Sequence, residues 1–219
     1  LSPNKLVPSA LVKQLCPTFL TLHRLLKIDE ADFLSKVQGT IKLGISFENW
    51  RKIGHQYIHS FGFTGQGCWA AGFQHFWLKG KQLGVSEDYG DYTPELKAAK
   101  ENKFGFLKEA PLHYAYHIDA GRYATFLRHL AEREGVTRIE GIVQEVGQRE
   151  DGAIKDIVLE SGQVIEGDFF VDCTGFAGLL IEKTLKTEFE TWQQWLPCDR
   201  AIAVQTAATE TPIPYTRSI

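Results

Sequence analysis

The 219-residue sequence contains no methionine and only four cysteines. Cys16, Cys68, Cys173 and Cys198 lie far apart and form no Cys-x-x-Cys pair. This spacing argues against a disulfide framework or a zinc site and favours reduced thiols in a cytoplasm. Because the chain begins at Leu1 and shows neither an initiator methionine nor a recognisable signal peptide, we expect it to be incomplete.

Long apolar runs and an excess of basic residues are also missing. A membrane-spanning helix needs about 18 consecutive apolar residues, and no such run occurs, so no membrane association is expected. The net charge is -3, and no basic stripe is present that could follow a phosphate backbone, so nucleic acid is not expected as a partner. The hydrophobic content of 43% suffices for one sizeable folded domain, or part of a larger one.

A glycine-rich loop for a dinucleotide is another absence. Such a loop follows a strand and reads Gly-x-Gly-x-x-Gly, which lets the backbone approach a pyrophosphate. Residues 62–67 carry three glycines, but their spacing is wrong and no strand is predicted before them. A complete dinucleotide-binding domain is therefore not expected in this chain.

The patterns that are present predict a mixture of helices and strands. Hydrophobic periodicity and capping residues predict helices over 17–26, 29–37, 94–100, 119–135 and 177–185. Runs typical of strands cover 40–47, 137–146, 154–160 and 163–173. The last three of these strands predict a small antiparallel excursion, and residues 1–16 are predicted to form an irregular arm.

The strand over 40–47 carries the most informative polar residue. Alternation places Lys42 on a face that it shares with Thr40 and Gly44, which leave room beside it. The densest cluster of aromatic residues follows, over 47–77. A strand lysine is most often a solvated surface residue. If Lys42 is instead held among aromatic rings, it is partly desolvated, and its amine becomes a nucleophile or a directed hydrogen-bond donor.

Two other groups of residues have the chemistry of a binding site. His59 and Phe61 fall on the same side of an extended segment and could sandwich a flat aromatic ligand, although core packing explains the same pair. His113, His117 and Asp119 have spacings that suggest a metal ion. The chain there is predicted to change from extended to helical, and nothing supplies a convergent third ligand, so no metal site is predicted.

The run Asp168-Phe-Phe-Val-Asp-Cys-Thr-Gly175 predicts a buried strand that ends at a glycine before a helix. Such a corner lets backbone amides approach a ligand closely. The order of helix, antiparallel strands, strand, Asp-Cys-Thr-Gly and helix is typical of the second half of a FAD-binding domain of the glutathione-reductase type. We place this second half at 113–185.

The predicted fold class is therefore α/β, with an incomplete sheet. Residues 17–219 are expected to form part of a FAD-binding domain of the glutathione-reductase type. An aromatic-rich substrate and surface region is inserted into it over 47–112.

Five segments, taken together in this order, resemble the flavin-dependent tryptophan halogenases. They are Ile28-Asp-Glu30, Thr40-Ile-Lys-Leu-Gly-Ile-Ser-Phe-Glu-Asn-Trp50, Tyr57-Ile-His-Ser-Phe-Gly62, Tyr114-Ala-Tyr-His-Ile-Asp-Ala-Gly121 and Phe169-Phe-Val-Asp-Cys-Thr-Gly-Phe176. The resemblance runs from about Pro17 to the C-terminus. It implies chlorination or bromination of tryptophan or a related indole, using dioxygen, a halide and reduced FAD from a separate flavin reductase, with hypohalous acid as the oxidant.

The resemblance also implies roles for individual residues. Lys42 matches the catalytic lysine of the family, which either forms a haloamine or hydrogen-bonds hypohalous acid and directs it to one carbon of the indole. The other matched positions are His59 and Phe61 at the substrate ring, Val143 near the adenine, and Thr174 and Gly175 near the flavin.

The sequence departs from the family pattern at both ends. Where the family has Gly-Glu-Ser/Ala-Thr-x-Pro beside the flavin, residues 13–17 match only the proline. The chain stops at Ile219, where the family continues into Trp-x-Trp-x-Ile-Pro and, beyond it, the catalytic glutamate. We therefore expect the chain alone to be inactive and to retain FAD weakly. A flavin monooxygenase that hydroxylates an aromatic substrate and a degenerate, non-catalytic module remain as alternatives.

Overall fold

The computed structural model describes residues 12–14, 18–106, 111–202, 204 and 212–219. The chain divides into two compact units. Unit 1 comprises Leu1–Arg133 and Val204–Ile219, and unit 2 comprises Glu134–Ala203. Helices and strands are mixed in a fold whose described residues form three small sheets of three strands each. This confirms the predicted α/β class with incomplete sheets.

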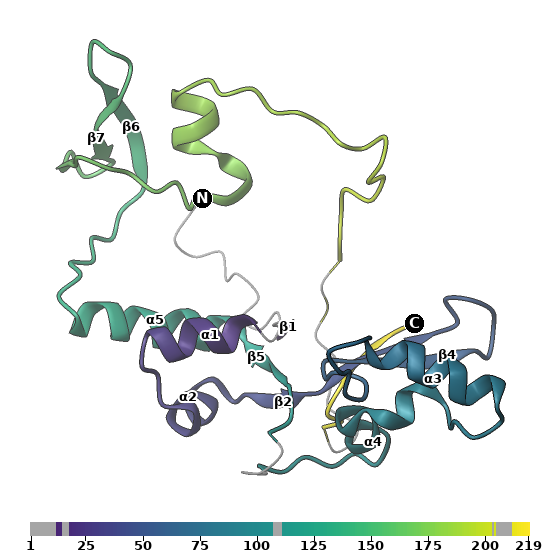
Figure 1. The fold of residues 1–219 in the computed structure, drawn as a ribbon. Helices are drawn as coiled ribbons and strands as arrows, with labels where there is room; N and C mark the ends of the chain where they lie inside the picture. Colours follow the sequence, from purple (N-terminus) through teal and green to yellow (C-terminus); the bar gives the residue numbers. More distant parts are fainter. Residues whose placement is uncertain (1–11, 15–17, 107–110, 203, 205–211) are drawn as a thin grey trace. The chain divides into compact units, whose positions relative to one another are not determined.

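Unit 1 contains an aromatic core between three helices and one antiparallel sheet (Figure 1). The helices are α1 (Thr18–Leu25), α2 (Glu30–Val37) and α5 (Ala120–Arg133). The sheet contains β1 (Val12–Gln14), β5 (Ala115–Asp119) and β2 (Thr40–Lys42), in that order. Phe33, Val37, Tyr116 and Ile118 are almost fully buried at its centre. Because aromatic rings bury the most area per residue, they dominate the stability of this core.

The helix ends in unit 1 follow from residues that the sequence singles out. The side chain of Asp29 accepts a hydrogen bond from the backbone amide of Asp32 at 2.8 Å. That of Asp119 accepts from the amides of Gly121 and Arg122 at 2.8 and 3.0 Å. Each carboxylate satisfies donors that the first turn leaves without partners. The four helices predicted before residue 136 are confirmed, with ends that differ by at most two residues.

The strand predicted over 40–47 is in fact two strands that belong to different sheets. The second sheet contains β4 (Gln56–Ser60), β3 (Gly44–Glu48) and β9 (Thr216–Ser218), in that order. The division falls at Leu43, whose amide donates to the carbonyl of Pro214 at 2.7 Å and whose carbonyl accepts from the amide of Phe61 at 2.9 Å. Alternation within one segment could not show this change of partners.

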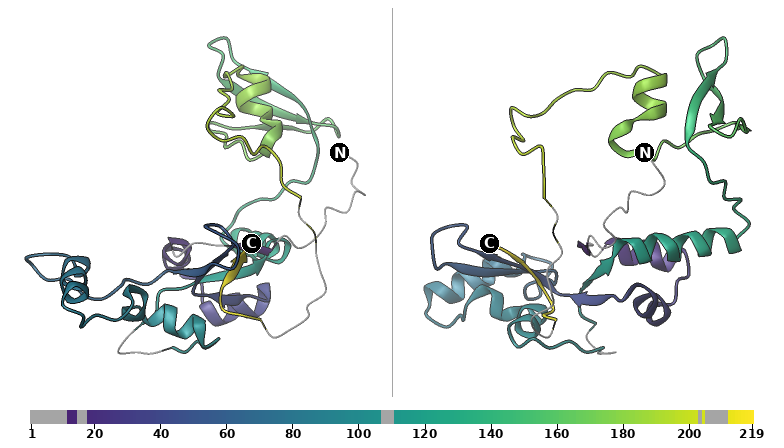
Figure 2. Two further views of the ribbon diagram at one scale, coloured as in Figure 1. Left: turned by 90° about the vertical axis from the view of Figure 1, so that its right-hand side faces the viewer. Right: turned by 180° about the vertical axis from the view of Figure 1, so that it is seen from behind.

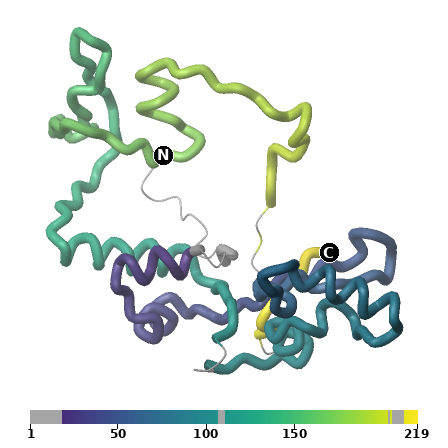
Figure 3. Tube along the Cα trace, viewed as in Figure 1, coloured from purple at the N-terminus to yellow at the C-terminus, as the bar shows by residue number. Residues whose placement is uncertain are grey.

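The C-terminal segment lies beside β3, although more than 160 residues separate them, as Figures 2 and 3 show. β9 pairs with β3 in parallel, with Thr216 opposite Ile45. On its other edge, β3 pairs antiparallel with β4, and the two backbones approach closely at Gly44. A Cβ atom at Gly44 would lie 2.5 Å from the carbonyl oxygen of His59 and 2.9 Å from the Cα of Ser60. This register therefore requires glycine.

The aromatic-rich segment differs from its prediction. Residues 73–82 form a helix, α3 (Phe73–Gln82), that the sequence analysis did not predict. It is followed by η1 (Tyr89–Tyr92) and α4 (Pro94–Lys100). Several large side chains expected to form a wall are exposed, and Trp69 is 99% exposed. The aromatic composition thus marked a region without showing which rings are buried.

Unit 2 contains an antiparallel sheet. Its strands are β6 (Val143–Gln148), β7 (Ile154–Leu159) and β8 (Val164–Glu166). They pair in sequence order, which confirms the predicted antiparallel excursion. The two connecting turns contain Gly152 and Gly162 with φ of 85° and 81°, the left-handed region that glycine adopts most easily.

Two predictions for unit 2 were wrong. Residues 168–173 do not extend the third strand, which ends at Glu166. The helix predicted over 177–185 is a short 3-10 turn, η2 (Gly175–Ala177), followed by a π-helix, η3 (Leu179–Thr184). The physical reason is a change of hydrogen-bond partners, because the amides of Lys183 and Leu185 donate to carbonyls five residues earlier, those of Gly178 and Leu180, at 3.0 and 2.9 Å.

Cys68, Cys173 and Cys198 are exposed free thiols. Cys16 and residues 1–11 of the predicted arm lie outside the described residues. The described part of that arm, β1, is a strand rather than irregular structure. Within the ranges that the structure describes, no helix is both long enough and apolar enough to cross a membrane.

Candidate functional site

Lys42 is a buried lysine at the junction between the two sheets of unit 1. Only 2% of its surface is exposed. Its Nζ atom lies 5.3 Å from the centre of the Phe61 ring, within the range of a cation–π interaction. The alternative of a solvated surface lysine is therefore excluded. An amine at this position is shielded from water and held against an aromatic face.

The loop that begins at Phe61, directly after β4, holds this residue in place. Its amide is bonded to the carbonyl of Leu43, and the next residue, Gly62, leaves no room for a side chain. A Cβ atom at Gly62 would overlap the carboxylate of Glu95. Glu95 is itself buried, and its Oε1 atom accepts from the amide of His113 at 2.7 Å and lies 3.1 Å from His113 Nδ1. The loop carrying Phe61 thus rests on a buried carboxylate of α4.

His59, the other residue predicted at the substrate ring, lies on β4 and is exposed. It pairs opposite Ile45 of β3. The structure therefore places Phe61 against the lysine, whereas the exposed imidazole of His59 is open to a ligand approaching β4.

His117, which the sequence suggested only as a possible metal ligand, lies near Lys42. His117 of β5 pairs opposite Thr40 of β2, and its Nδ1 lies 3.4 Å from Thr40 Oγ1. Its Nε2 lies 2.9 Å from Thr216 Oγ1. Burial and, secondly, the charge of Lys42 lower the pKa of His117 to about 4, so its imidazole is neutral near pH 7. The sequence indicated only that Thr40 and Lys42 share a face of their strand. It could not show that His117 lies opposite Thr40, because the pairing of distant strands is not encoded in a local pattern.

No cluster of three or more His, Cys, Asp or Glu side chains suited to a metal ion occurs in the described parts of the chain. The three residues whose spacing suggested one have other partners. His113 is bonded to Glu95, His117 lies between the two threonines, and Asp119 caps α5.

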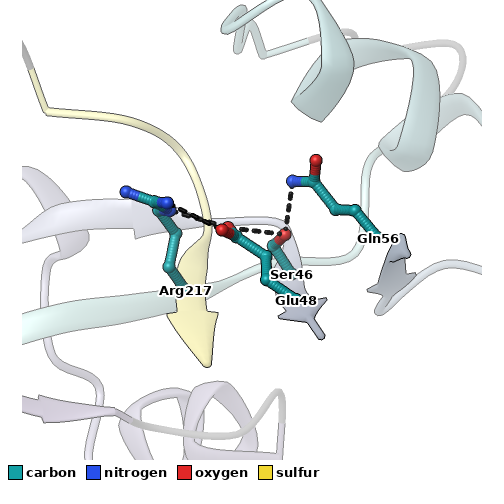
Figure 4. A network of polar contacts seen from close by, with 4 residues as sticks. All are labelled: Ser46, Glu48, Gln56 and Arg217. Carbon is teal, nitrogen blue, oxygen red and sulfur yellow. Dashed lines mark hydrogen bonds and ion pairs between the residues drawn. The ribbon is translucent and has the colours of Figure 1, made fainter. Parts of the chain in front are cut away.

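A polar network joins the three strands of the second sheet (Figure 4). Arg217 Nε and Nη2 donate to the two carboxylate oxygens of Glu48, each at 2.7 Å. Ser46 Oγ donates to Glu48 at 3.3 Å and accepts from Gln56 Nε2 at 2.8 Å. The hydrogen bonds from Arg217 lower the pKa of Glu48. Because the network connects β3, β4 and β9, it helps to fix the C-terminal segment beside the lysine junction.

A separate cleft in unit 1 does not contain these residues. It is a cleft of about 1070 Å³ between α2 and α5. Its lining includes Ile28, Asp29, Lys36, Arg122, Phe126 and His129. Neither Lys42 nor Phe61 lines this cleft, so its volume gives no information about a substrate at the lysine.

The residues predicted at the flavin all lie in unit 2. Val143 is the first residue of β6, and Thr174 and Gly175 lie at the start of η2. The carboxylate of Asp172 organises this turn. It accepts from the amide and hydroxyl of Thr174 at 3.0 and 2.6 Å, and from the amides of Leu180 and Ile181 in η3, at 2.9 and 3.0 Å. These hydrogen bonds, led by the Thr174 hydroxyl, hold the pKa of Asp172 well below its usual range.

The turn at Gly175 fits the approach of a flavin in one respect. Gly175 has φ of +65°, and no atom lies within 4 Å of the position that its Cβ would take. A bound group can therefore reach the backbone here, as flavin and nucleotide sites require. Thr174 fits in a different way, because its hydroxyl is engaged by Asp172 and by the amide of Leu179 at 2.9 Å. Its side chain shapes the turn, and the backbone remains to contact a ligand.

Comparisons with known proteins identify the family. A sequence model described as tryptophan halogenase matches residues 12–219. The chain is 32% identical over 207 residues to the 7-chloro-L-tryptophan 6-halogenase KtzR of Kutzneria sp. (strain 744), an alignment that covers 82% of this chain and 39% of the relative. It is 30% identical over 198 residues to the tryptophan 7-halogenase RebH of Lentzea aerocolonigenes, covering 82% and 37%.

Solved structures agree with this. A flavin-dependent halogenase from Xanthomonas campestris matches with a TM-score of 0.88 and 48% identity, covering 95% of this chain and 43% of that one. The flavin-dependent halogenase BrvH from Brevundimonas sp. BAL3 matches with a TM-score of 0.82 and 34% identity, covering 92% and 43%. The chain belongs to the tryptophan halogenase family, as its sequence predicted. It spans about two fifths of the length of these relatives.

Proposed function

We propose that this chain carries the halogen-directing lysine of a flavin-dependent halogenase that acts on tryptophan or a related indole. The single observation that carries the proposal is the burial of Lys42 with its amine against the face of Phe61. The names of the relatives KtzR and RebH state that those proteins halogenate tryptophan. A buried amine in a member of this family is therefore best explained by the halogenation step.

The amine has a defined task in this step. A hydrogen bond from Lys42 Nζ to the oxygen of hypohalous acid fixes that small molecule and polarises its oxygen–halogen bond. One indole carbon attacks the halogen and forms a carbon–halogen bond. The proton lost from that carbon and the hydroxide released by hypohalous acid leave as water, so the step needs no additional oxidant. Because 98% of the lysine surface is covered, bulk water does not compete for the amine.

The aromatic side chains nearby supply the second requirement, a fixed ring. We propose that His59 and Phe61 pack against the indole by offset stacking, in which aromatic rings lie a few ångströms apart. Phe61 already contacts the amine, so a ring packed against it has a defined distance to Lys42. That distance decides which carbon of the indole receives the halogen.

The turn of unit 2 is proposed to contact FAD. Thr174 and Gly175 would present backbone groups to the flavin, and Val143 would lie near the adenine. A bound reduced flavin would supply two of the four electrons that dioxygen requires, and chloride or bromide supplies the other two as it becomes hypohalous acid. Delivery of the reduced flavin by a separate, transiently bound flavin reductase completes this proposal.

We further propose that the 219 residues by themselves are inactive and bind FAD weakly. The chain spans about two fifths of its relatives, and no Gly-x-Gly-x-x-Gly follows a strand in it. That loop provides most backbone contacts to a dinucleotide pyrophosphate. Titration of the chain with FAD, followed by flavin fluorescence, is expected to show no saturation at stoichiometric FAD. A tight one-to-one complex would overturn this part of the proposal.

The decisive experiment replaces the lysine in the enzyme expressed from its complete coding sequence. Lys42→Ala is expected to reduce halogenated indole, measured by mass spectrometry, to the background without enzyme, while oxidation of reduced flavin continues. Lys36→Ala is the matched control, because Lys36 Nζ also lies over a ring, 5.7 Å from that of Phe126, but its side chain is 58% exposed. This control is expected to keep its activity.

Other outcomes would assign another function. Loss of flavin oxidation in Lys42→Ala would place the lysine in the flavin reaction. A hydroxylated product that forms without halide would indicate an aromatic-hydroxylating monooxygenase. An unaltered enzyme that neither oxidises reduced flavin nor changes an indole would indicate a non-catalytic module.

A further inference from the structure

The junction that carries Lys42 is held from both sides of its strand. Immediately after the lysine, the backbone of Leu43 is bonded to Pro214 on one side and to Phe61 on the other. Two residues before it, the hydroxyl of Thr40 lies 3.4 Å from Nδ1 of His117. The same imidazole reaches Thr216 of β9 through Nε2, at 2.9 Å. His117 is therefore a bridge between the sheet that contains β2 and the sheet that contains β3.

We propose that His117 is a positioning residue for Lys42, because it bridges Thr40 and Thr216 across the junction and so holds the amine against Phe61. Thr40 and Lys42 are two residues apart on β2 and share a face. Thr216 is anchored independently, because β9 pairs with β3 in parallel. A shift of His117 would therefore move the lysine strand relative to the ring. The inference rests on the proposed function only where halogenation is the readout.

The neutral imidazole suits this bridging role. It has one N–H donor and one nitrogen acceptor, and a hydroxyl group can serve as the partner of either. Burial of the ring and, secondly, the charge of Lys42 both favour this neutral form. A second positive charge at this point would repel the ammonium and displace it from the ring of Phe61. A neutral His117 thus keeps its hydrogen bonds and does not repel the amine of Lys42 from its position.

Unit 1 contains another histidine, His23, that serves as a matched control. His23 is 4% exposed and lies 3.4 Å from the hydroxyl of Tyr123. Burial lowers its pKa as well. Its neighbours are rings of the aromatic core, with Phe19 and Phe33 at centroid distances of 4.3 and 4.4 Å. Substitution of His23 therefore tests the general cost of replacing a buried histidine in this unit.

The test compares His117→Leu, which fills the space but removes both hydrogen bonds, with His117→Gln, which remains neutral and polar. Each variant is made in the enzyme expressed from its complete coding sequence. The first readout is halogenated indole formed per flavin oxidised, together with hypohalous acid that escapes and converts an added thioether to its sulfoxide. The second readout needs neither flavin nor halide. It is the rate at which a small acylating reagent modifies Lys42, measured on the peptide that contains it.

Loss of one or two hydrogen bonds corresponds to about a tenfold effect. His117→Leu is therefore expected to form roughly tenfold less product per flavin and to be acylated at Lys42 roughly tenfold faster, with more sulfoxide and unchanged flavin oxidation. His117→Gln is expected to stay within about threefold of the unaltered enzyme in both readouts. His23→Leu and His23→Gln are expected to lower the thermal stability and to change neither readout.

Three results would overturn the inference. In the first, His117→Leu behaves as the unaltered enzyme does. In the second, His117→Gln is as impaired as His117→Leu, which would indicate a general requirement for the ring. In the third, His23→Leu changes product coupling and acylation to the same extent. If the unaltered enzyme forms no halogenated indole, the proposed function fails, and the acylation rates still decide the role of His117.

Discussion

The two units hold their important polar groups in opposite ways. Around Lys42, the partners come from distant parts of the sequence, because Thr40 and His117 are 77 residues apart and His117 and Thr216 are 99 apart. Around Asp172, the four hydrogen bonds all come from residues that follow within nine positions. A substitution at the lysine junction is therefore expected to act on the whole of unit 1, and one at Asp172 only on its own turn.

The two units also differ in how many apolar side chains they bury. The fully buried aromatic and aliphatic side chains, such as Phe33, Tyr116 and Leu43, belong to unit 1. Among the described residues of unit 2, the buried apolar side chains are Leu159 and Leu180. Regions with few buried apolar contacts open at a lower free energy than a packed core. Unit 1 thus provides a rigid site for the lysine, whereas unit 2 presents a turn shaped mainly by local hydrogen bonds.

The largest expected effect is that of Gly44→Ala. The new Cβ would press on the backbone of His59 and Ser60, which cannot move without breaking the pairing of β3 with β4. We expect the free energy of unfolding of unit 1 to fall by about 3 kcal/mol. Gly105→Ala is the control, because no atom lies within 4 Å of its Cβ position. Thermal unfolding measures the stability of both variants. Equal stabilities would contradict the conclusion that β3 and β4 pack too closely at Gly44 to accept a side chain.

The next prediction concerns acid and His117. Its pKa in the folded state is about 4, below the value of about 6.5 expected in the unfolded chain. The unfolded chain therefore binds more protons between these values, and the stability contributed by neutral His117 is present near pH 7 and is lost as the pH falls. From pH 7 to pH 5 the expected loss is about 2 kcal/mol.

Denaturant titrations at the two pH values measure this loss. His117→Gln is expected to lose about 2 kcal/mol less than the unaltered chain between them. His23, whose pKa is also lowered, contributes to both proteins and cancels in the difference. Equal losses in the two proteins would show that His117 titrates normally in the folded state and is not desolvated beside Lys42.

A smaller and local effect is expected for Asp172→Ala. The substitution removes the acceptor of the amides of Leu180 and Ile181, so hydrogen exchange at these two amides should accelerate. Exchange at the amide of Phe61 in unit 1 should stay unchanged. Asp151→Ala is the control, since Asp151 accepts only from the nearby amide of Ala153 among the described contacts. Faster exchange throughout unit 1 would show that the two units unfold together.

The smallest effect is predicted for Arg217→Ala at the exposed end of the network in Figure 4. Arg217 is the main cause of the lowered pKa of Glu48, ahead of Ser46. The pKa of Glu48 is therefore expected to rise toward its ordinary value, and by more than in Ser46→Ala. NMR titration of the Glu48 carboxyl measures both. Acylation of Lys42 should change little, and a large change would show that the lysine junction depends on this network.

The helices α1, α2, α4 and α5 were predictable because their signals are local. Asp29 and Asp119 cap amides within three residues of themselves, and α4 begins at Pro94, as the sequence indicated. The antiparallel sheet of unit 2 was predictable for the same reason, since each turn contains a glycine with positive φ. Failures occurred where a segment changes partners. The strand over 40–47 divides between two sheets, and residues 179–184 form a π-helix whose amides donate to carbonyls five residues earlier.

In the candidate site, too, some features could be predicted from the sequence and others could not. The sequence alone determined the family and the helices α1, α2, α4 and α5, and it singled out Lys42 as a candidate, because each depends on residue types at short, fixed spacings. Only the tertiary structure decided that Lys42 is buried, that its amine faces Phe61 and that His117 lies beside it. The physical reason is that burial and strand pairing are made by segments that are far apart in the chain, and no local pattern specifies which of them meet.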